Sequence, residues 1–97
     1  MKYFIAATFR VQRIGTNCPK AATIIYSATC VKALQSLGKI LDNLNVNRND
    51  RPAGCYRIKN GKGFYNSIVD PSLTDPSKFG NRGGICMKTG KNGLRIW

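Results

Sequence analysis

Apolar and polar residues alternate over residues 2–14, with the period of two that is typical of a strand with one buried face. The start of this segment also looks like a signal peptide. However, Arg10 and Arg13 follow the short apolar run at once, and no small-residue cleavage site comes next. We therefore interpret it as a strand of the folded chain. The positions on its apolar face are Tyr3, Ile5, Ala7, Phe9 and Val11.

A period of three and four residues begins near residue 28 and predicts one amphipathic helix over about 28–37. Ser27 is the expected N-cap, because its hydroxyl can accept a hydrogen bond from a free amide of the first turn. Gly38 is the expected stop after the last turn. The apolar stripe of this helix consists of Cys30, Ala33, Leu34, Leu37 and Leu41.

The strongest local signal in the chain is a β-hairpin over residues 55–66. Asn60-Gly61 stands between two short runs rich in aromatic and β-branched residues. This dipeptide suits a type I′ turn, because both central residues of that turn need a positive φ. The hairpin gathers cysteine, aromatic and basic residues at one place. In its first arm, Tyr56 and Ile58 share one face, and Cys55, Arg57 and Lys59 share the other.

The remaining segments divide between loops and short strands. Residues 43–53 are rich in Asn, Asp and Pro, and we expect them to form a loop that leads into the hairpin. Residues 67–83 lose all periodicity and are expected to form a long loop. Short strands are expected at 23–26, 85–88 and 94–97.

A chain of 97 residues allows one domain, and we assign residues 1–97 to it. The order of its elements predicts the α+β class, with one helix packed on a small, mostly antiparallel sheet. A domain of this size buries only about 60–65% of the surface that its unfolded chain exposes, so its core alone is marginal. Covalent links would therefore help to stabilise it.

Four cysteines offer such links. An even number in a small chain favours two disulfides and an oxidising compartment, either extracellular or the lumen of an organelle. The alternatives are buried free thiols and a zinc site, but zinc sites usually take ligands in close pairs, and this chain has no histidine. We expect no metal and no other cofactor. The cysteines are Cys18, Cys30, Cys55 and Cys86.

The chain is strongly basic, with sixteen Lys and Arg against four acidic residues and a net charge of +12. Such a field favours polyanions or anionic surfaces as partners. Without His or Glu, acid–base catalysis would fall to Asp, Lys, Tyr or Cys. Asp70 and Asp75 stand in turn sequences, where aspartates usually bond nearby backbone amides. We therefore do not expect an enzyme, and no apolar segment approaches the ~20 residues of a membrane span.

Several short motifs resemble a small four-cysteine module found in large secreted or surface proteins of marine algae and other protists. That module has a Cys-Pro, an isoleucine run, and a cysteine that opens an Ala-rich helix ending in Leu-Gly. Pro-x-Gly-Cys-Tyr, Gly-x-x-Tyr/Phe-Asn and Ile-Cys-basic follow. The similarity covers about residues 17–88. The matching residues are Cys18-Pro19, Ile24-Ile25, Cys30, Ala33, Leu37-Gly38, Pro52-Ala53-Gly54-Cys55-Tyr56, Gly63-Phe64-Tyr65-Asn66 and Ile85-Cys86-Met87-Lys88.

The resemblance implies a disulfide-stabilised, non-enzymatic module and brings no catalytic residues. Four cysteines allow three pairings. We expect Cys30–Cys55 to join the helix to the hairpin, because Cys30 lies on the apolar stripe, and Cys18–Cys86 to join the two ends of the module. The helix region is basic here, whereas the module is usually acidic or neutral there, and the module usually belongs to longer chains. Both differences fit a basic accessory subunit.

Basic and aromatic residues interleave around the hairpin and indicate where a partner would bind. We favour a structural or interaction role, in which this surface docks on an acidic protein within a larger assembly. The alternative is RNA or single-stranded DNA, because bases stack on aromatic rings while cations hold phosphates. For Tyr56 and Phe64 we favour a purely structural role, in which they pack under the helix, because the sheet needs a core.

An anionic membrane surface is a third candidate partner, for which the short, mildly basic helix gives little support. The glycine-rich residues 80–84 could also cradle a phosphate, but they lack the ending of a P-loop, so a flexible turn is favoured. The residues expected to contact an anionic partner are Arg48, Arg51, Arg57, Lys59, Lys62 and Arg82, with aromatic contacts from Tyr56, Tyr65 and Trp97.

Overall fold

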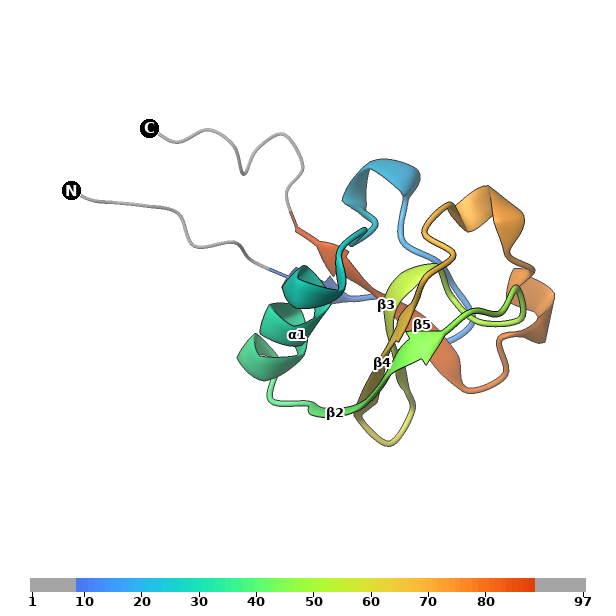
Figure 1. Cartoon of the computed structure of the whole chain (residues 1–97). Coiled ribbons are helices and arrows are strands. Elements are labelled where there is room, and N and C mark those ends of the chain that lie inside the picture. Colours follow the sequence, from blue (N-terminus) through green and yellow to red (C-terminus); the bar gives the residue numbers. More distant parts are fainter. Residues whose placement is uncertain (1–8, 89–97) are drawn as a thin grey trace.

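The computed structural model describes residues 9–88, and this part of the chain has the predicted α+β fold (Figure 1). One helix packs against a five-stranded sheet with the strand order β1-β5-β3-β4-β2. No helix within residues 9–88 has the length and apolar character that crossing a bilayer requires. The elements are β1 (Phe9–Val11), α1 (Ser27–Ser36), β2 (Ile40–Val46), β3 (Gly54–Ile58), β4 (Lys62–Asn66) and β5 (Arg82–Met87), with 3-10 turns at Lys20–Ala22, Pro71–Leu73 and Pro76–Lys78.

Helix α1 ends as the sequence predicts but begins differently. Gly38 has a φ of 69°, and the N–H groups of Gly38 and Lys39 bond to carbonyls of the last turn. This is a Schellman motif, which a glycine forms at least cost. The expected N-cap was wrong: Ser27 is already helical, and the cap position is Tyr26, with no side-chain hydrogen bond. Leu41 lies beyond the stop, in β2, and is 43% exposed.

Strand β2 replaces the first part of the loop that was expected over 43–53. It runs parallel to β4 at the edge of the sheet, whereas the other three strand pairs are antiparallel. Its ladder has register shifts on both sides of Asn43, and only Leu44 and Val46 are partly buried. A strand with so little burial needs no alternation of apolar and polar residues, so the Asn-rich sequence resembled a loop.

The predicted hairpin is present, but its turn is one residue longer than expected. Arg57 pairs with Gly63, so the chain reverses over three residues rather than over Asn60-Gly61 alone. Gly61 has a φ of 101°, and its N–H bonds to the Ile58 carbonyl at 2.9 Å. This geometry is that of a type I turn followed by a left-handed glycine. The register change places Tyr56 opposite Phe64.

The two faces of the sheet are covered by different parts of the chain. Helix α1 covers the face that carries Cys55 and Ile85, and its Cys30 and Leu34 belong to the same buried cluster. The Cys30–Cys55 disulfide joins the helix to β3, as predicted. Gly63 lies against Leu34 so closely that a Cβ there would be 2.1 Å from a Leu34 methyl. This face is therefore closed.

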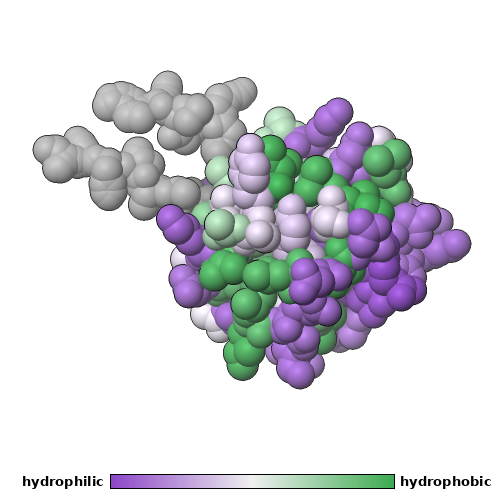
Figure 2. All heavy atoms as spheres, in the orientation of Figure 1, coloured by the Kyte–Doolittle hydropathy of each residue, from purple (hydrophilic) through white to green (hydrophobic). Residues whose placement is uncertain are grey.

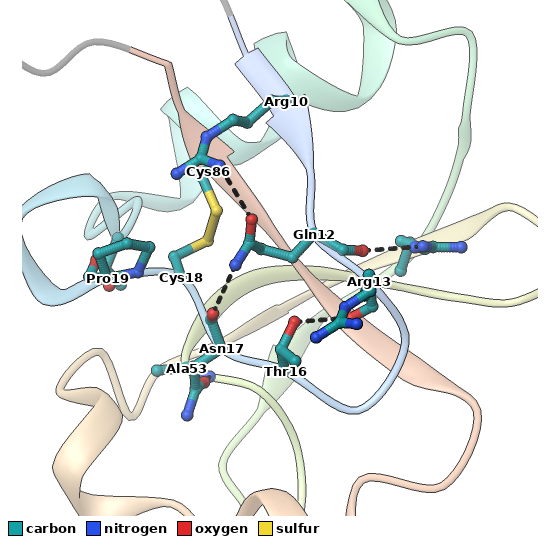
Figure 3. Close-up of a disulfide and its surroundings, with 11 residues drawn as sticks. Arg10, Gln12, Arg13, Thr16, Asn17, Cys18, Pro19, Ala53 and Cys86 are labelled. Atoms are coloured by element: carbon teal, nitrogen blue, oxygen red, sulfur yellow. Dashed lines mark hydrogen bonds between the residues drawn. A yellow bond between two sulfur atoms is a disulfide. The ribbon is translucent and has the colours of Figure 1, made fainter.

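The second predicted disulfide, Cys18–Cys86, lies on the other face of the sheet (Figure 3). Next to it, the Gln12 side chain donates a hydrogen bond to the Asn17 carbonyl at 3.1 Å. The Asn17 side chain accepts a hydrogen bond from the Ala53 N–H at 2.9 Å. The disulfide therefore fixes the segment between β1 and α1 to β5, and the Asn17–Ala53 hydrogen bond fixes it to the loop that precedes β3.

Other expectations about strands are partly corrected. Residues 23–26 form no strand, and Thr23 makes only a single bridge to Cys86. Residues 82–84 do not form a flexible turn but open β5, which pairs with β3. In β1, Phe9 packs against the core as expected, whereas Val11 is 37% exposed. The remainder of the predicted first strand before residue 9, the strand at 94–97 and Trp97 lie outside the described residues.

Candidate functional site

A basic cleft of about 370 Å³ lies on the sheet face opposite helix α1. Its position follows from strand alternation: Tyr56 and Ile58 alternate with Cys55, which faces the helix. In Figure 2, hydrophilic residues gather over the side where Figure 1 places the loop after β2 and the turns before β5. The residues that line the cleft are Asn43, Val46, Arg48, Arg51, Tyr56, Ile58, Phe64, Asn81 and Arg82.

The floor of the cleft contains a stacked pair of aromatic rings. The ring centroids of Tyr56 and Phe64 are 5.1 Å apart, and the ring planes differ by 12°. Tyr56 is only 1% exposed, and Phe64 is partly buried. Burial raises the pKa of the Tyr56 hydroxyl, although Arg51 and Arg82 oppose this shift through their positive charge. The expectation that these rings pack under the helix was wrong, since they pack together on the other face.

Two arginines of the cleft are oriented by one carboxylate. Arg48 donates from Nε and Nη2 to the two carboxylate oxygens of Asp50, at 2.8 and 2.9 Å. Nη1 of Arg51 lies 2.9 Å from the same carboxylate. These contacts, first of all the hydrogen bond from Arg48, hold the pKa of Asp50 far below its ordinary value. Asp50 therefore stays ionised over the physiological pH range and fixes both guanidinium groups.

The third arginine approaches from the start of β5. Nη1 of Arg82 donates to the Phe79 carbonyl at 3.0 Å. Between them, Gly80 has a φ of 60°, a left-handed conformation that glycine adopts without strain. A Cβ on Gly80 would lie 3.4 Å from the same Nη1 atom. The turn thus brings the Arg82 guanidinium into place and leaves room for it.

One buried side chain holds the loop that carries Arg48 and Arg51. Asn66, at the end of β4, is 0% exposed. Its Nδ2 donates to the carbonyls of Arg48 at 2.8 Å, Pro52 at 3.0 Å and Arg51 at 3.4 Å. Its Oδ1 accepts the N–H groups of Arg48 at 3.2 Å and Ile68 at 3.1 Å. The end of β4 therefore fixes the arginine loop.

The structure places the predicted contact residues at three locations: the cleft, the helix face and the hairpin turn. Arg48, Arg51, Arg82 and Tyr56 line the cleft together. Arg57 and Tyr65 lie on the helix face, where Nη2 of Arg57 donates to the Gln12 carbonyl and the Tyr65 hydroxyl donates to the Ile25 carbonyl. Lys59 is exposed in the hairpin turn, and Lys62, which directly follows the turn, has its Nζ 3.9 Å from the Asp42 carboxylate. Trp97 is outside the described residues.

Sequence reasoning missed the residues that shape the cleft. The position of Asp50 between two arginines was the available signal for a shared ion-pair partner. Asn43, Asn81 and Asn66 gave no comparable signal, because their roles depend on β2 and on the fold of the 47–53 loop. The expectation for Asp70 and Asp75 is confirmed, since they accept from the N–H groups of Ser72 and Ser77. The pKa of Asp70 is lowered first of all by the Ser72 N–H, and that of Asp75 first of all by the Ser77 hydroxyl.

Within residues 9–88, no three side chains from His, Cys, Asp and Glu gather in a way that could hold a metal ion. The cleft instead offers guanidinium groups, amides and one hydroxyl over an apolar floor. These groups can bind an anion by charge-assisted hydrogen bonds. Comparison of the chain with protein-family models, curated proteins and solved structures finds no match.

Proposed function

We propose that this protein is a non-enzymatic, basic interaction subunit that docks on an anionic partner protein through the arginine cleft. The main support is that Arg48, Arg51 and Arg82 come from two distant segments of the chain and line one cleft on the face away from the helix. Arginine is the cation best suited to hold carboxylate or phosphate groups in a fixed geometry. The partner would present an acidic surface within a larger assembly.

The two disulfides support a location in an oxidising compartment for this role. Two disulfides, Cys18–Cys86 and Cys30–Cys55, are compatible with an oxidising compartment. We infer that the protein works outside the cell or in an organelle lumen, as a relative of the four-cysteine modules that its motifs resemble. In that setting the basic residues around the helix, Lys32 and Lys39, set this chain apart from modules that are neutral or acidic there.

The packing of the aromatic rings bears on the nucleic-acid alternative. Tyr56 is 1% exposed and stacks on Phe64, so a nucleobase has at most one partly exposed ring to stack on in the cleft. Single-strand binding usually combines a basic groove with several accessible rings. The observations therefore favour a protein partner over RNA or single-stranded DNA.

The proposal is tested with an acidic peptide as probe and two charge-matched variants. In the cleft variant, Arg48, Arg51 and Arg82 are each replaced by Gln. In the control variant, Lys32, Lys59 and Lys78, which are all exposed, are replaced by Gln. Both variants lose the same charge, so they differ only in where the charge was. We expect affinity for the peptide to fall more than tenfold in the cleft variant and less than threefold in the control, as measured by isothermal titration calorimetry.

Equal losses in both variants would show that only the overall charge matters, and the cleft would not be the site. An oligonucleotide is titrated alongside the peptide at several salt concentrations, because phosphate contacts produce a steep salt dependence. Tighter binding of the oligonucleotide, lost in the cleft variant alone, would replace the protein partner with a nucleic acid.

A further inference from the structure

All three cations that line the cleft are arginines, and each is held in place by other groups of the protein. Asp50 binds Nε and Nη2 of Arg48 and Nη1 of Arg51, and the Phe79 carbonyl binds Nη1 of Arg82. Within residues 9–88, no hydrogen bond engages Nη1 of Arg48 or Nε and Nη2 of Arg82, whereas the Arg51 side chain also lies within hydrogen-bond reach of the Tyr56 hydroxyl. The guanidinium groups are thus oriented in advance while keeping donors for a ligand, which reduces the entropy cost of binding.

Asp50 also limits which anion can gain from this cleft. Its carboxylate already takes the paired donors of Arg48 and one donor of Arg51. A second monovalent carboxylate would meet a cluster that is partly neutralised. Three guanidinium groups and one carboxylate leave a net charge of +2. This charge matches a phosphate monoester, which carries about −1.5 to −2 at pH 7 and accepts hydrogen bonds at three oxygens.

The other side of the cleft is apolar. Val46, Ile58 and Phe64 line it, and each is partly exposed. A free inorganic ion would leave this wall in contact with water, whereas a ligand with an aromatic ring next to its anionic group would cover it. The volume of about 370 Å³ is at the small end of the range for pockets that hold a compact organic group.

We propose that the cleft recognises a tyrosine side chain of the partner protein that is esterified with phosphate. The inference rests on the proposed function and names the chemical group that the partner presents. The ester oxygens accept hydrogen bonds from the free donors of Arg48, Arg51 and Arg82. The ring of the modified tyrosine lies against Phe64, Ile58 and Val46.

The experiment titrates the full chain with one peptide in five forms. Its central residue is phosphotyrosine, sulfotyrosine, phosphoserine, glutamate or unmodified tyrosine, and phenyl phosphate and inorganic phosphate are tested separately. We expect the phosphotyrosine peptide to bind at least tenfold more tightly than the phosphoserine and glutamate peptides, and phenyl phosphate to bind more tightly than inorganic phosphate. The sulfotyrosine peptide should bind less tightly than the phosphotyrosine peptide, because a sulfate ester carries only one negative charge; the opposite order would contradict the match of charge.

Two variants assign the effect to the two sides of the cleft. Arg82→Gln is expected to weaken all of the anionic peptides, whereas Ile58→Ser is expected to remove the advantage of the phosphotyrosine peptide and leave the phosphoserine affinity within twofold. Folding of each variant is checked by its thermal melting transition.

Equal binding of the phosphotyrosine, phosphoserine and glutamate peptides, all lost in Arg82→Gln, would overturn this inference and leave the proposed function intact. Binding of none of the peptides would overturn both. A preference for the phosphotyrosine peptide that survives Arg82→Gln and Ile58→Ser together would place its site elsewhere and also overturn the inference.

Discussion

The two faces of the sheet are built from neighbouring residues of the same strands but have opposite character. On the helix face, Cys55 is bonded to Cys30, Gly63 touches Leu34, and Nη2 of Arg57 and the Tyr65 hydroxyl donate to backbone carbonyls. On the other face, the next residues along, Tyr56 and Phe64, form the floor of an open cleft that is rimmed by arginines.

Under the proposed function, this difference separates stability from recognition within a chain of 97 residues. Because side chains alternate across a strand, one hairpin can supply both a closed core and an accessible site. The cations follow the same division. Arg57 donates to a backbone carbonyl on the helix face, whereas Arg48, Arg51 and Arg82 line the cleft. Substitutions on the helix face should therefore change stability, and substitutions in the cleft should change binding.

Removal of the disulfides should have the largest effect on stability, and it tests whether stability and binding depend on different faces of the sheet. Replacing both cysteines of Cys30–Cys55 with Ala should lower the free energy of unfolding by about 3.5 kcal/mol, and the same change at Cys18–Cys86 by about 4.5 kcal/mol, following the chain-entropy dependence on loop length. The sequence separations are 25 and 68 residues. Urea denaturation measures both values. Variants that remain folded should keep their affinity for the acidic peptide; a loss of affinity at equal folded fraction would contradict the division.

Asn66→Ala should change both stability and binding, because this side chain is buried in β4 and also holds the loop that carries Arg48 and Arg51. The variant leaves two N–H groups and at least two carbonyls of the loop without their partner, and we expect a loss of about 3 kcal/mol in stability. It should also weaken peptide binding, since Arg48 and Arg51 are no longer held in place. Asn47→Ala, whose side chain bonds to Ser67 on the surface, is the control. If only stability changes in Asn66→Ala, the loop does not depend on this residue for its geometry.

Gly63→Ala tests how closely helix α1 packs against β4. The new methyl group would overlap with Leu34, which must move in a packed core, and we expect a loss of about 2 kcal/mol. Leu34→Ala alone creates a cavity and should cost more, about 3 kcal/mol. In the double variant the new methyl fills part of that cavity, so the total loss should be smaller than the sum of the two. Additive losses, measured by urea denaturation, would show that the two side chains do not meet.

The smallest expected effect is on the pH dependence of stability, to which the Asp50 carboxylate in the arginine cluster contributes. Because the pKa of Asp50 is lower in the folded protein than in the unfolded chain, the unfolded chain takes up the proton first as the pH falls. The stability contributed by this carboxylate is therefore complete above its ordinary pKa of 3.8 and is lost progressively below it. Asp50→Asn should reduce the change in melting temperature between pH 5 and pH 2. Asp42→Asn, at the exposed ion pair with Lys62, should leave it nearly unchanged.

The local features of this fold could be predicted from the sequence, whereas the cleft depended on long-range structure. The stop of α1 at Gly38, the hairpin and both disulfides follow from turn chemistry and from the position of Cys30 on an apolar stripe. The turn register at Asn60-Gly61 was wrong by one residue. Strand β2 was missed because it is an exposed, irregular edge strand.

The candidate site, too, could be predicted from the sequence only in part. The positive charge and the aromatic residues of the hairpin indicated an anion-binding surface and named four of the cleft residues. The sequence did not separate Arg57 from Arg48, because both are basic residues near the hairpin. Only the pairing of β3 with β4 and β5 determines that Arg57 points toward the helix and that Arg82, which is distant in sequence, joins the cleft.

The central claim, that anionic partners bind at the cleft and not at the basic surface in general, is tested most directly by NMR. The acidic peptide is titrated into the ¹⁵N-labelled protein, and backbone amide and arginine Nε–H signals are followed. The account predicts shifts confined to residues 43–51, 56–58, 64 and 79–82, with the Nε–H signals of Arg51 and Arg82 among the largest. Shifts spread evenly over Lys32, Lys59, Lys62 and Lys78, with the signals of the cleft unchanged, would contradict it.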